Sequence, residues 1–142
     1  MEKVQVVLDT NVLVAALRSK RGAASLLIRG LLQGQWQLNV SNPLLLEYED
    51  VLKRTEMNDF VPGDEVDEFI DALSSVATNH RIFFLWRLMV RDQGDAFVFE
   101  PAVKAGVDYL VTFNTKDFPL ASQFGVKLVT PREFLEAVGE LP

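Results

Sequence analysis

Side chains that can bind a metal ion through oxygen follow three of the strands that the sequence predicts. They are Asp9 after the first of these strands, Asp92 and Asp95 after the second, and Asn114 and Asp117 after the third. If the sheet is parallel, these side chains share one edge of it, and carboxylates that lie together need protons or a cation. An oxygen-only ligand set suits Mg²⁺ or Mn²⁺ rather than zinc. Such an ion supports the hydrolysis of a phosphodiester.

Asp9 lies at the junction between a predicted strand and a predicted helix. Residues 4–8 are apolar except for Gln5 and rich in valine, which is typical of a strand covered on both faces. Asp9, Thr10 and Asn11 follow at once, and such residues cap helices and line turns. The carboxyl edge of an open α/β sheet is also where ligands bind. From this stretch alone, a helix cap and a chemical role for Asp9 are equally supported.

The composition excludes several classes of site. The chain has 142 residues, one histidine and no cysteine, so disulfides, thiolate metal sites and Cys-His nucleophiles are excluded. Around the single histidine, no Ser-His-Asp set can be recognised in the sequence. The length predicts one domain over residues 1–142. No apolar run approaches the ~20 residues that span a bilayer, and the N-terminus lacks the pattern of a signal peptide. We therefore expect a soluble cytoplasmic protein without membrane contact.

The net charge is acidic. Fourteen Lys and Arg against twenty Asp and Glu give −6, which argues against a generic basic nucleic-acid-binding surface. An enzyme whose acidic site is neutralised by a bound cation remains compatible with this charge, because the ion is then the dominant local charge.

Helices and strands alternate along the sequence. The predicted strands are 4–8, 36–40, 82–85, 109–112 and 126–129. The predicted helices are 12–17, 23–32, 42 to about 54, 64–75, 96–105 and 131–138. The last helix follows a capping box from Thr130 to Glu133. This alternation predicts a three-layer α/β/α domain with a central parallel sheet and an acidic cluster at its carboxyl edge.

Five stretches, in this order and over essentially the whole chain, resemble PIN-domain ribonucleases. They are residues 6–11, Glu47 in a helix opened by Ser41-Asn42-Pro43, Arg91-Asp92 with Asp95, residues 109–119, and residues 129–135. The last stretch also resembles the subgroup of toxins from toxin–antitoxin modules. The resemblance implies a metal-dependent endoribonuclease that cleaves single-stranded RNA with Mg²⁺ or Mn²⁺. It further implies a cognate antitoxin protein as a partner and a homodimer.

The resemblance also assigns roles to individual residues. Carried over by position, it makes Asp9, Glu47 and Asp95 three catalytic acids that bind the metal. The fourth acidic position, usually Asp, falls on Asn114, which can ligate through its carbonyl oxygen but brings no charge. We therefore expect Asp117 to supply the missing charge and to join the catalytic and metal-binding residues. The residues expected to orient ligands or the attacking water through hydrogen bonds are Thr10, Asn11, Asp92 and Thr112.

The residue pattern alone leaves two of these assignments open. In the helix predicted from residue 42, Glu47 and Glu49 lie at opposite borders of the inward stripe, each about 100° from its centre. The resemblance alone selects Glu47. Asp92 or Asp95 could instead cap the helix predicted at 96–105, and Asp95 stands directly before that helix.

Two other functions compete with RNA cleavage. The first is a PIN-like domain that binds RNA or a partner without cutting, which Asn114 in place of an acid keeps open. The second is a receiver-type phosphoacceptor module, but that fold needs an acidic pair directly after the first strand. Here Asp9 is the one acid at that point, and Asn11 occupies the place where an aspartyl phosphatase needs its second aspartate.

Overall fold

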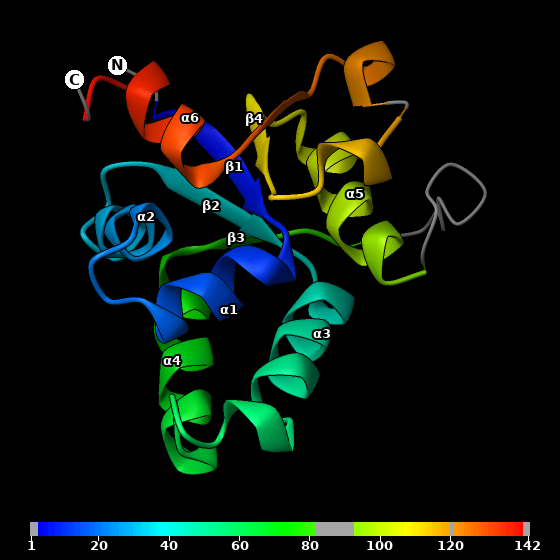
Figure 1. The fold of residues 1–142 in the computed structure, drawn as a ribbon. Helices are drawn as coiled ribbons and strands as arrows, with labels where there is room; N and C mark the ends of the chain where they lie inside the picture. Colours follow the sequence, from blue (N-terminus) through cyan, green and yellow to red (C-terminus); the bar gives the residue numbers. More distant parts are fainter. Residues whose placement is uncertain (1–2, 82–92, 120, 141–142) are drawn as a thin grey trace.

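A computed structural model describes residues 3–81, 93–119 and 121–140 of the chain. Within these ranges, five strands form one parallel sheet in the order β3-β2-β1-β4-β5 (Figure 1). The strands are β1 (Gln5–Leu8), β2 (Gln37–Val40), β3 (Thr78–Asn79), β4 (Tyr109–Val111) and β5 (Lys127–Val129). The helices are α1 (Thr10–Arg18), α2 (Ala23–Leu32), α3 (Asn42–Leu52), α4 (Gly63–Val76), α5 (Gln93–Ala105) and α6 (Pro131–Ala137). Short 3-10 turns are η1 (Thr55–Met57), η3 (Thr115–Asp117) and η4 (Ala121–Phe124).

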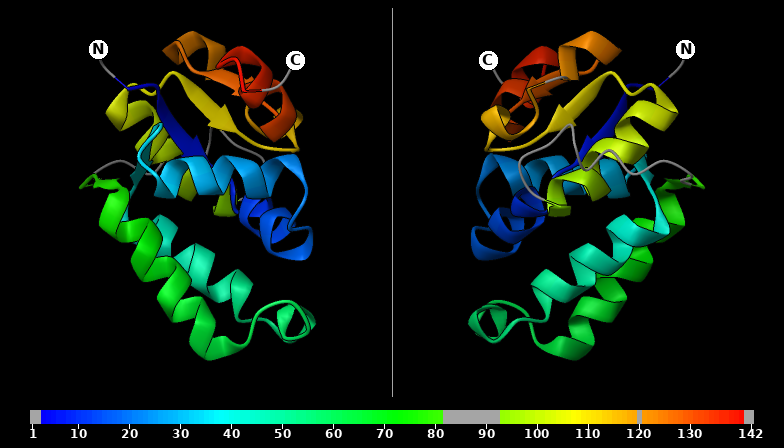
Figure 2. Two further views of the ribbon diagram at one scale, coloured as in Figure 1. Left: turned by 90° about the vertical axis from the view of Figure 1, so that its left-hand side faces the viewer. Right: turned by 90° about the vertical axis from the view of Figure 1, so that its right-hand side faces the viewer.

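Helices cover both faces of the sheet. Helix α5 packs on β1, β2 and β4, whereas α6 packs on β4 and β5 from the opposite side (Figure 2). Helices α3 and α4 pack against each other and extend away from the sheet (Figures 1 and 2). Among the described residues, no helix is both long and apolar enough to cross a membrane. The predicted α/β class with a central parallel sheet is confirmed.

The central strand β1 explains why Asp9 is placed next to Thr112. Val6, Val7 and Leu8 are completely buried, as expected for a parallel strand covered on both faces. Leu8 pairs with Val111 of β4, so the next residue of each strand, Asp9 and Thr112, lies at the same edge. The chain runs from β1 to β2 on one side of β1, whereas β4 pairs on its other side. The carboxyl ends of β1 and β4 therefore flank the point where open α/β sheets bind ligands.

Among the described residues, the structure differs from the predicted elements at β3 and at the start of α5. The strand predicted at 82–85 lies outside the described residues, and within these the edge strand next to β2 is β3, a two-residue exposed strand that was not predicted. Helix α5 begins at Gln93, three residues before the predicted start, so Asp95 lies in its first turn and not before it. Pro101 lies inside α5, where it has no backbone N–H to donate to the Phe97 carbonyl.

A tight contact between α2 and an aromatic cluster holds the sheet to its outer helices. The Trp36 ring meets Phe134 of α6 edge-on at 5.1 Å between centroids, and Tyr109 meets Phe134 in the same manner at 5.4 Å. Gly30 of α2 lies against this cluster, because a Cβ atom there would stand 2.0 Å from Cζ3 of Trp36. Gly30 is therefore required by the close approach of the indole to the helix backbone.

Replacing Gly30 with alanine is expected to lower the free energy of unfolding by about 1–3 kcal/mol, the usual cost of overpacking a core. Alanine favours a helix by about 1 kcal/mol over glycine, but the overlap with Trp36 outweighs this gain. Urea unfolding monitored by circular dichroism measures the change. The matched control is Gly63→Ala in α4, where a Cβ meets nothing within 4 Å. Equal stability of the two variants would contradict the packing argument.

Candidate active site

The Asp9 carboxylate is held in place by β4. Asp9 is 8% exposed, and its Oδ2 accepts a hydrogen bond of 2.7 Å from the Thr112 hydroxyl, which is fully buried. The Asp9 backbone N–H donates to the Val111 carbonyl at 2.9 Å. Asp9 stands at the N-cap position of α1, but its side chain makes no capping hydrogen bond. The short side-chain hydrogen bond to the Asp9 carboxylate therefore comes from the neighbouring strand end, and a chemical role for Asp9 stays a prediction.

The surroundings of Asp9 disfavour its negative charge. Burial raises the pKa of the Asp9 carboxyl above its ordinary value of 3.8, and the negative charge of Asp117 adds to this rise. The Thr112 hydroxyl and the backbone N–H groups of Thr10 and Asn11 lower the pKa and oppose the rise in part. A cation beside Asp9 would reverse this balance, because a positive charge favours the ionised form. We call Asp9, Thr112 and Asp117 the Asp9 site.

Asp117 and Asn114 differ in their relation to Asp9. Asp117 ends the short turn η3, is half-buried, and lies near enough for its charge to act on Asp9. Asn114 is exposed, and its backbone N–H donates to the Thr112 hydroxyl oxygen at 3.0 Å. The charge of Asp117 therefore acts on Asp9, whereas Asn114 has no charge. A ligand role for the Asn114 amide stays a prediction.

Tyr48 of α3 was not predicted as a site residue, yet it contacts the end of β1. Its side chain is fully buried, and its hydroxyl donates a hydrogen bond to the Leu8 carbonyl, one residue before Asp9. Burial raises the pKa of Tyr48 well above its ordinary value of 10.0, and the charge of Asp9 adds to this effect. The phenol therefore stays a donor and ties α3 to the strand end that carries Asp9. In the sequence, Tyr48 is indistinguishable from an ordinary core residue.

The structure separates Glu47 from Glu49, which periodicity did not. Glu49 binds Lys53 at 3.3 Å, and Lys53 binds Asp67 of α4 at 2.8 Å, so Glu49 faces α4. Glu47 is two residues earlier, about 200° around the helix, and therefore lies on the border away from α4. It is half-buried and adjoins Tyr48 in the chain. This position is compatible with the predicted role of Glu47 at the site.

Helix α5 carries two further acids. Asp95 is half-buried in the first turn, where the helix dipole favours a negative charge. Glu100 is 3% exposed, and sequence reasoning missed it. The sequence did contain a signal for Glu100, because it is an acid among the apolar residues on the inward face of its helix.

Figure 1 shows α1, α3 and α5 gathered near the carboxyl end of β1. Asp92 lies outside the described residues.

The donor atoms at the Asp9 site fit a hard divalent cation. Within the described ranges, no three Asp, Glu, His or Cys side chains are placed so that they could hold a metal ion together. The Asn11 Oδ1 atom, however, is buried without a hydrogen-bond partner among the described residues, two positions after Asp9. Carboxylate and amide oxygens are the ligands that Mg²⁺ and Mn²⁺ prefer. Which side chains complete the ligand set stays a prediction.

Comparisons with known proteins agree with the fold and identify the family. Residues 5–116 match the PIN domain family. The chain is similar to a chain in the crystal structure of VapBC2 from Rickettsia felis bound to a DNA fragment from their promoter. That similarity has a TM-score of 0.59 at 16% sequence identity and covers 88% of this chain and 97% of the other, so it concerns the fold. A comparison with curated proteins gives no match.

Proposed function

Because the chain belongs to the PIN domain family, we propose that it is a metal-dependent endoribonuclease that hydrolyses phosphodiester bonds of single-stranded RNA. The observation that supports this most directly is the buried Asp9 carboxylate, held by Thr112 and accompanied by Asp117 at the switch point of the sheet. The receiver-type alternative is not retained, because the family match is to a different domain.

The proposed metal is Mg²⁺ or Mn²⁺. Asp9, Glu47, Asp95 and Asp117 would hold it, with Asn114 as a further oxygen donor. When bound, the ion would polarise the phosphodiester and stabilise the charge that develops on the leaving oxygen. The raised pKa of Asp9 supports a cation at this point, since burial and Asp117 disfavour its charge and no cation of the described residues offsets them. The Asn11 Oδ1 atom, which accepts no hydrogen bond among the described residues, is a further oxygen donor two positions along the chain.

The other polar groups of the site would orient the ligands and transfer protons. Thr112 fixes the direction of the Asp9 carboxylate, and Tyr48 fixes the strand end. Thr10, Asn11 and Asp92 are proposed to orient ligands or the attacking water. His80 is the one histidine of the chain, and its ring lies 2.8 Å from Asn39 Oδ1 on β2. Since the His80 imidazole is engaged with Asn39, we propose that a carboxylate of the site accepts the proton of the attacking water.

We further propose that the protein is the toxin of a toxin–antitoxin module. Support comes from residues 129–135, which resemble that subgroup of PIN domains, and from the fold shared with a chain of the VapBC2 structure. In this proposal a cognate antitoxin protein binds the chain and blocks cleavage, and the chain forms a homodimer. Co-expression with the product of an adjacent gene, followed by co-purification and a growth assay, tests the antitoxin proposal.

The direct test is cleavage of a labelled single-stranded RNA by the purified protein. We expect cleavage with Mg²⁺ or Mn²⁺ and none in EDTA, with activity restored when metal is added back in excess. A matched duplex RNA and a single-stranded DNA of the same sequence measure the substrate class. Calorimetric titration with Mn²⁺ measures metal binding independently of activity.

Three results would change the proposal. Cleavage that persists in EDTA would contradict a metal-dependent mechanism. Metal and RNA binding without cleavage would favour the non-cleaving domain, in which Asn114 replaces a required acid. Cleavage of duplex RNA or DNA as fast as single-stranded RNA would contradict the substrate class.

A further inference from the structure

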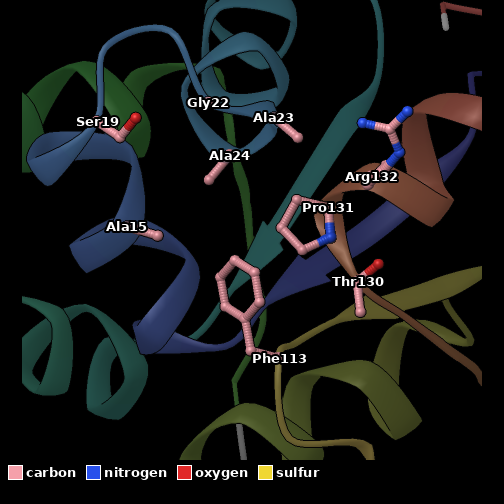
Figure 3. Close-up of a pocket in the computed structure, with 9 residues that line it drawn as sticks. All are labelled: Ala15, Ser19, Gly22, Ala23, Ala24, Phe113, Thr130, Pro131 and Arg132. Carbon is pink, nitrogen blue, oxygen red and sulfur yellow. The ribbon is translucent and has the colours of Figure 1, made fainter.

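We propose that a pocket beside the Asp9 site binds one unpaired nucleobase of the RNA by stacking on Phe113. This inference rests on the proposed function, because it assigns a place to part of the single-stranded substrate. The pocket has a volume of about 330 Å³ and lies between the α1–α2 connection, the residue that follows Thr112, and the start of α6. We call it the Phe113 pocket, after the side chain at its base (Figure 3).

Phe113 is presented to solvent by the same loop that holds Asp9. Thr112 points inward to Asp9, and its hydroxyl oxygen also accepts the Asn114 backbone N–H at 3.0 Å. The intervening residue therefore projects the other way, and Phe113 is 49% exposed. Figure 3 shows its ring directed into the pocket, with Ala15 and Ala24 on one side and Pro131 on the other. An exposed aromatic ring next to a phosphodiester-cleaving centre is a suitable platform for a base.

The walls suit a flat apolar group of limited size. The side chains around the ring are small, since alanines line the α1 and α2 walls and Pro131 forms the third. Gly22 adds no side chain to its part of the wall, where a Cβ would stand 3.2 Å from the Ser19 Oγ atom. The volume lies at the lower end of the ~300–1,000 Å³ that ligand pockets occupy. A single base fits these walls better than a helix or an extended peptide.

The rim offers the polar groups that a nucleotide needs. Arg132 lies across the pocket from Phe113 (Figure 3), and its side chain is 72% exposed. Its Nε binds Glu136 at 3.2 Å, an exposed ion pair that contributes little to stability. The guanidinium can therefore approach a phosphate, which positions a strand without reading its sequence. Ser19 and Thr130 also line the pocket. The Thr130 hydroxyl oxygen accepts the Glu133 backbone N–H at 3.2 Å, so towards the edge of a base this hydroxyl would act as a donor.

Binding of a short single-stranded oligoribonucleotide in EDTA tests the Phe113 pocket without hydrolysis. Fluorescence anisotropy is measured for the wild type and for Phe113→Leu, which keeps an apolar side chain but removes the ring. We expect binding to weaken about 5- to 100-fold, the range for loss of one stacked base. Phe113→Tyr keeps the ring and should bind like the wild type. The matched control is Phe60→Leu, since Phe60 is 42% exposed and does not line the pocket.

A set of oligoribonucleotides, each with one abasic position, identifies the bound base. One abasic position should weaken binding by the wild type as much as Phe113→Leu does, and should have no further effect on that variant. Cleavage of the intact oligoribonucleotide with Mg²⁺ should then give a different product pattern for Phe113→Leu. Thermal unfolding of each variant verifies the fold.

The outcomes separate this inference from the proposed function. If the wild type binds and cleaves RNA and Phe113→Leu does the same with the same product pattern, the pocket is not a base site and the proposed function stands. If Phe113→Leu keeps full RNA binding but loses a co-purifying antitoxin, the pocket accepts a protein side chain and the inference is wrong. If the wild type neither binds nor cleaves RNA, both proposals fail.

Discussion

Replacement of Asp9 by asparagine is expected to reduce RNA cleavage more than about 100-fold while leaving the fold intact. Loss of a residue that merely orients a metal ligand costs about 10- to 100-fold, and Asp9 is proposed as a ligand itself. The asparagine side chain has nearly the same shape, and its carbonyl oxygen can still accept the hydrogen bond that Thr112 donates at 2.7 Å. The substitution removes the charge and replaces one of the two acceptor oxygens with an NH2 group.

The same substitution is expected to stabilise the metal-free protein at neutral pH. Burial raises the pKa of Asp9 above 3.8 in the folded chain, so the ionised form is less stable there than in the unfolded chain. The protonated Asp9 carboxyl therefore causes no loss of stability below pH 3.8, its ordinary pKa. As the pH rises from there through the higher pKa of the folded chain, the free energy of unfolding falls. Asparagine carries no charge and avoids this loss. Urea unfolding in EDTA at pH 7 and below pH 3.8 measures the difference, which should vanish at the lower pH.

The control for Asp9→Asn is Asp71→Asn, since Asp71 is an exposed acid on α4. This variant should keep both the activity and the stability of the wild type. An Asp9→Asn protein that still cleaves RNA within tenfold of the wild type would contradict the metal-ligand role. One that loses activity and also stability in EDTA would indicate that Asp9 serves the fold.

The fold was largely predictable because its strongest signals are local. Residues 4–8 are apolar except for Gln5, a pattern typical of a strand buried on both faces, and this strand is the centre of the sheet. The capping box from Thr130 to Glu133 defines the start of α6, and both of its hydrogen bonds are present. β3 was missed because a two-residue exposed strand is specified by its neighbour β2 and not by its own residues.

The site was predictable only in part, because the sequence reports neighbours along the chain and not across the sheet. Asp9 and Thr112 were both identified, but their contact depends on the register that pairs Leu8 with Val111. Tyr48 and Phe113 carry no chemical signal in the sequence. Tyr48 is linked to the site by its hydrogen bond to the Leu8 carbonyl at the end of β1. Phe113 is distinguished from a core residue by its exposure.

Thr112→Val is the second substitution with a large expected effect, and it tests whether an uncharged neighbour sets the metal affinity of Asp9. Valine has the shape of threonine but has no hydroxyl, so Asp9 loses the donor at 2.7 Å. We expect Mn²⁺ affinity or cleavage to fall about 10- to 100-fold. The pKa of Asp9 should rise further, because the Thr112 hydrogen bond lowers it at present. Calorimetry measures the affinity, and the pH dependence of Mn²⁺ binding reports the change in pKa.

Thr112→Ser separates the hydroxyl of Thr112 from its shape. Serine keeps a donor for Asp9 and an acceptor for the Asn114 backbone N–H, which lies 3.0 Å from the hydroxyl oxygen. Its lost methyl leaves a small cavity, because Thr112 is fully buried, so stability should fall while metal affinity stays near that of the wild type. Thr112→Val should show the reverse order, with affinity lost more than stability. If the two variants bind Mn²⁺ equally, the direction of the Asp9 carboxylate does not depend on the hydroxyl, and the strand register alone places it.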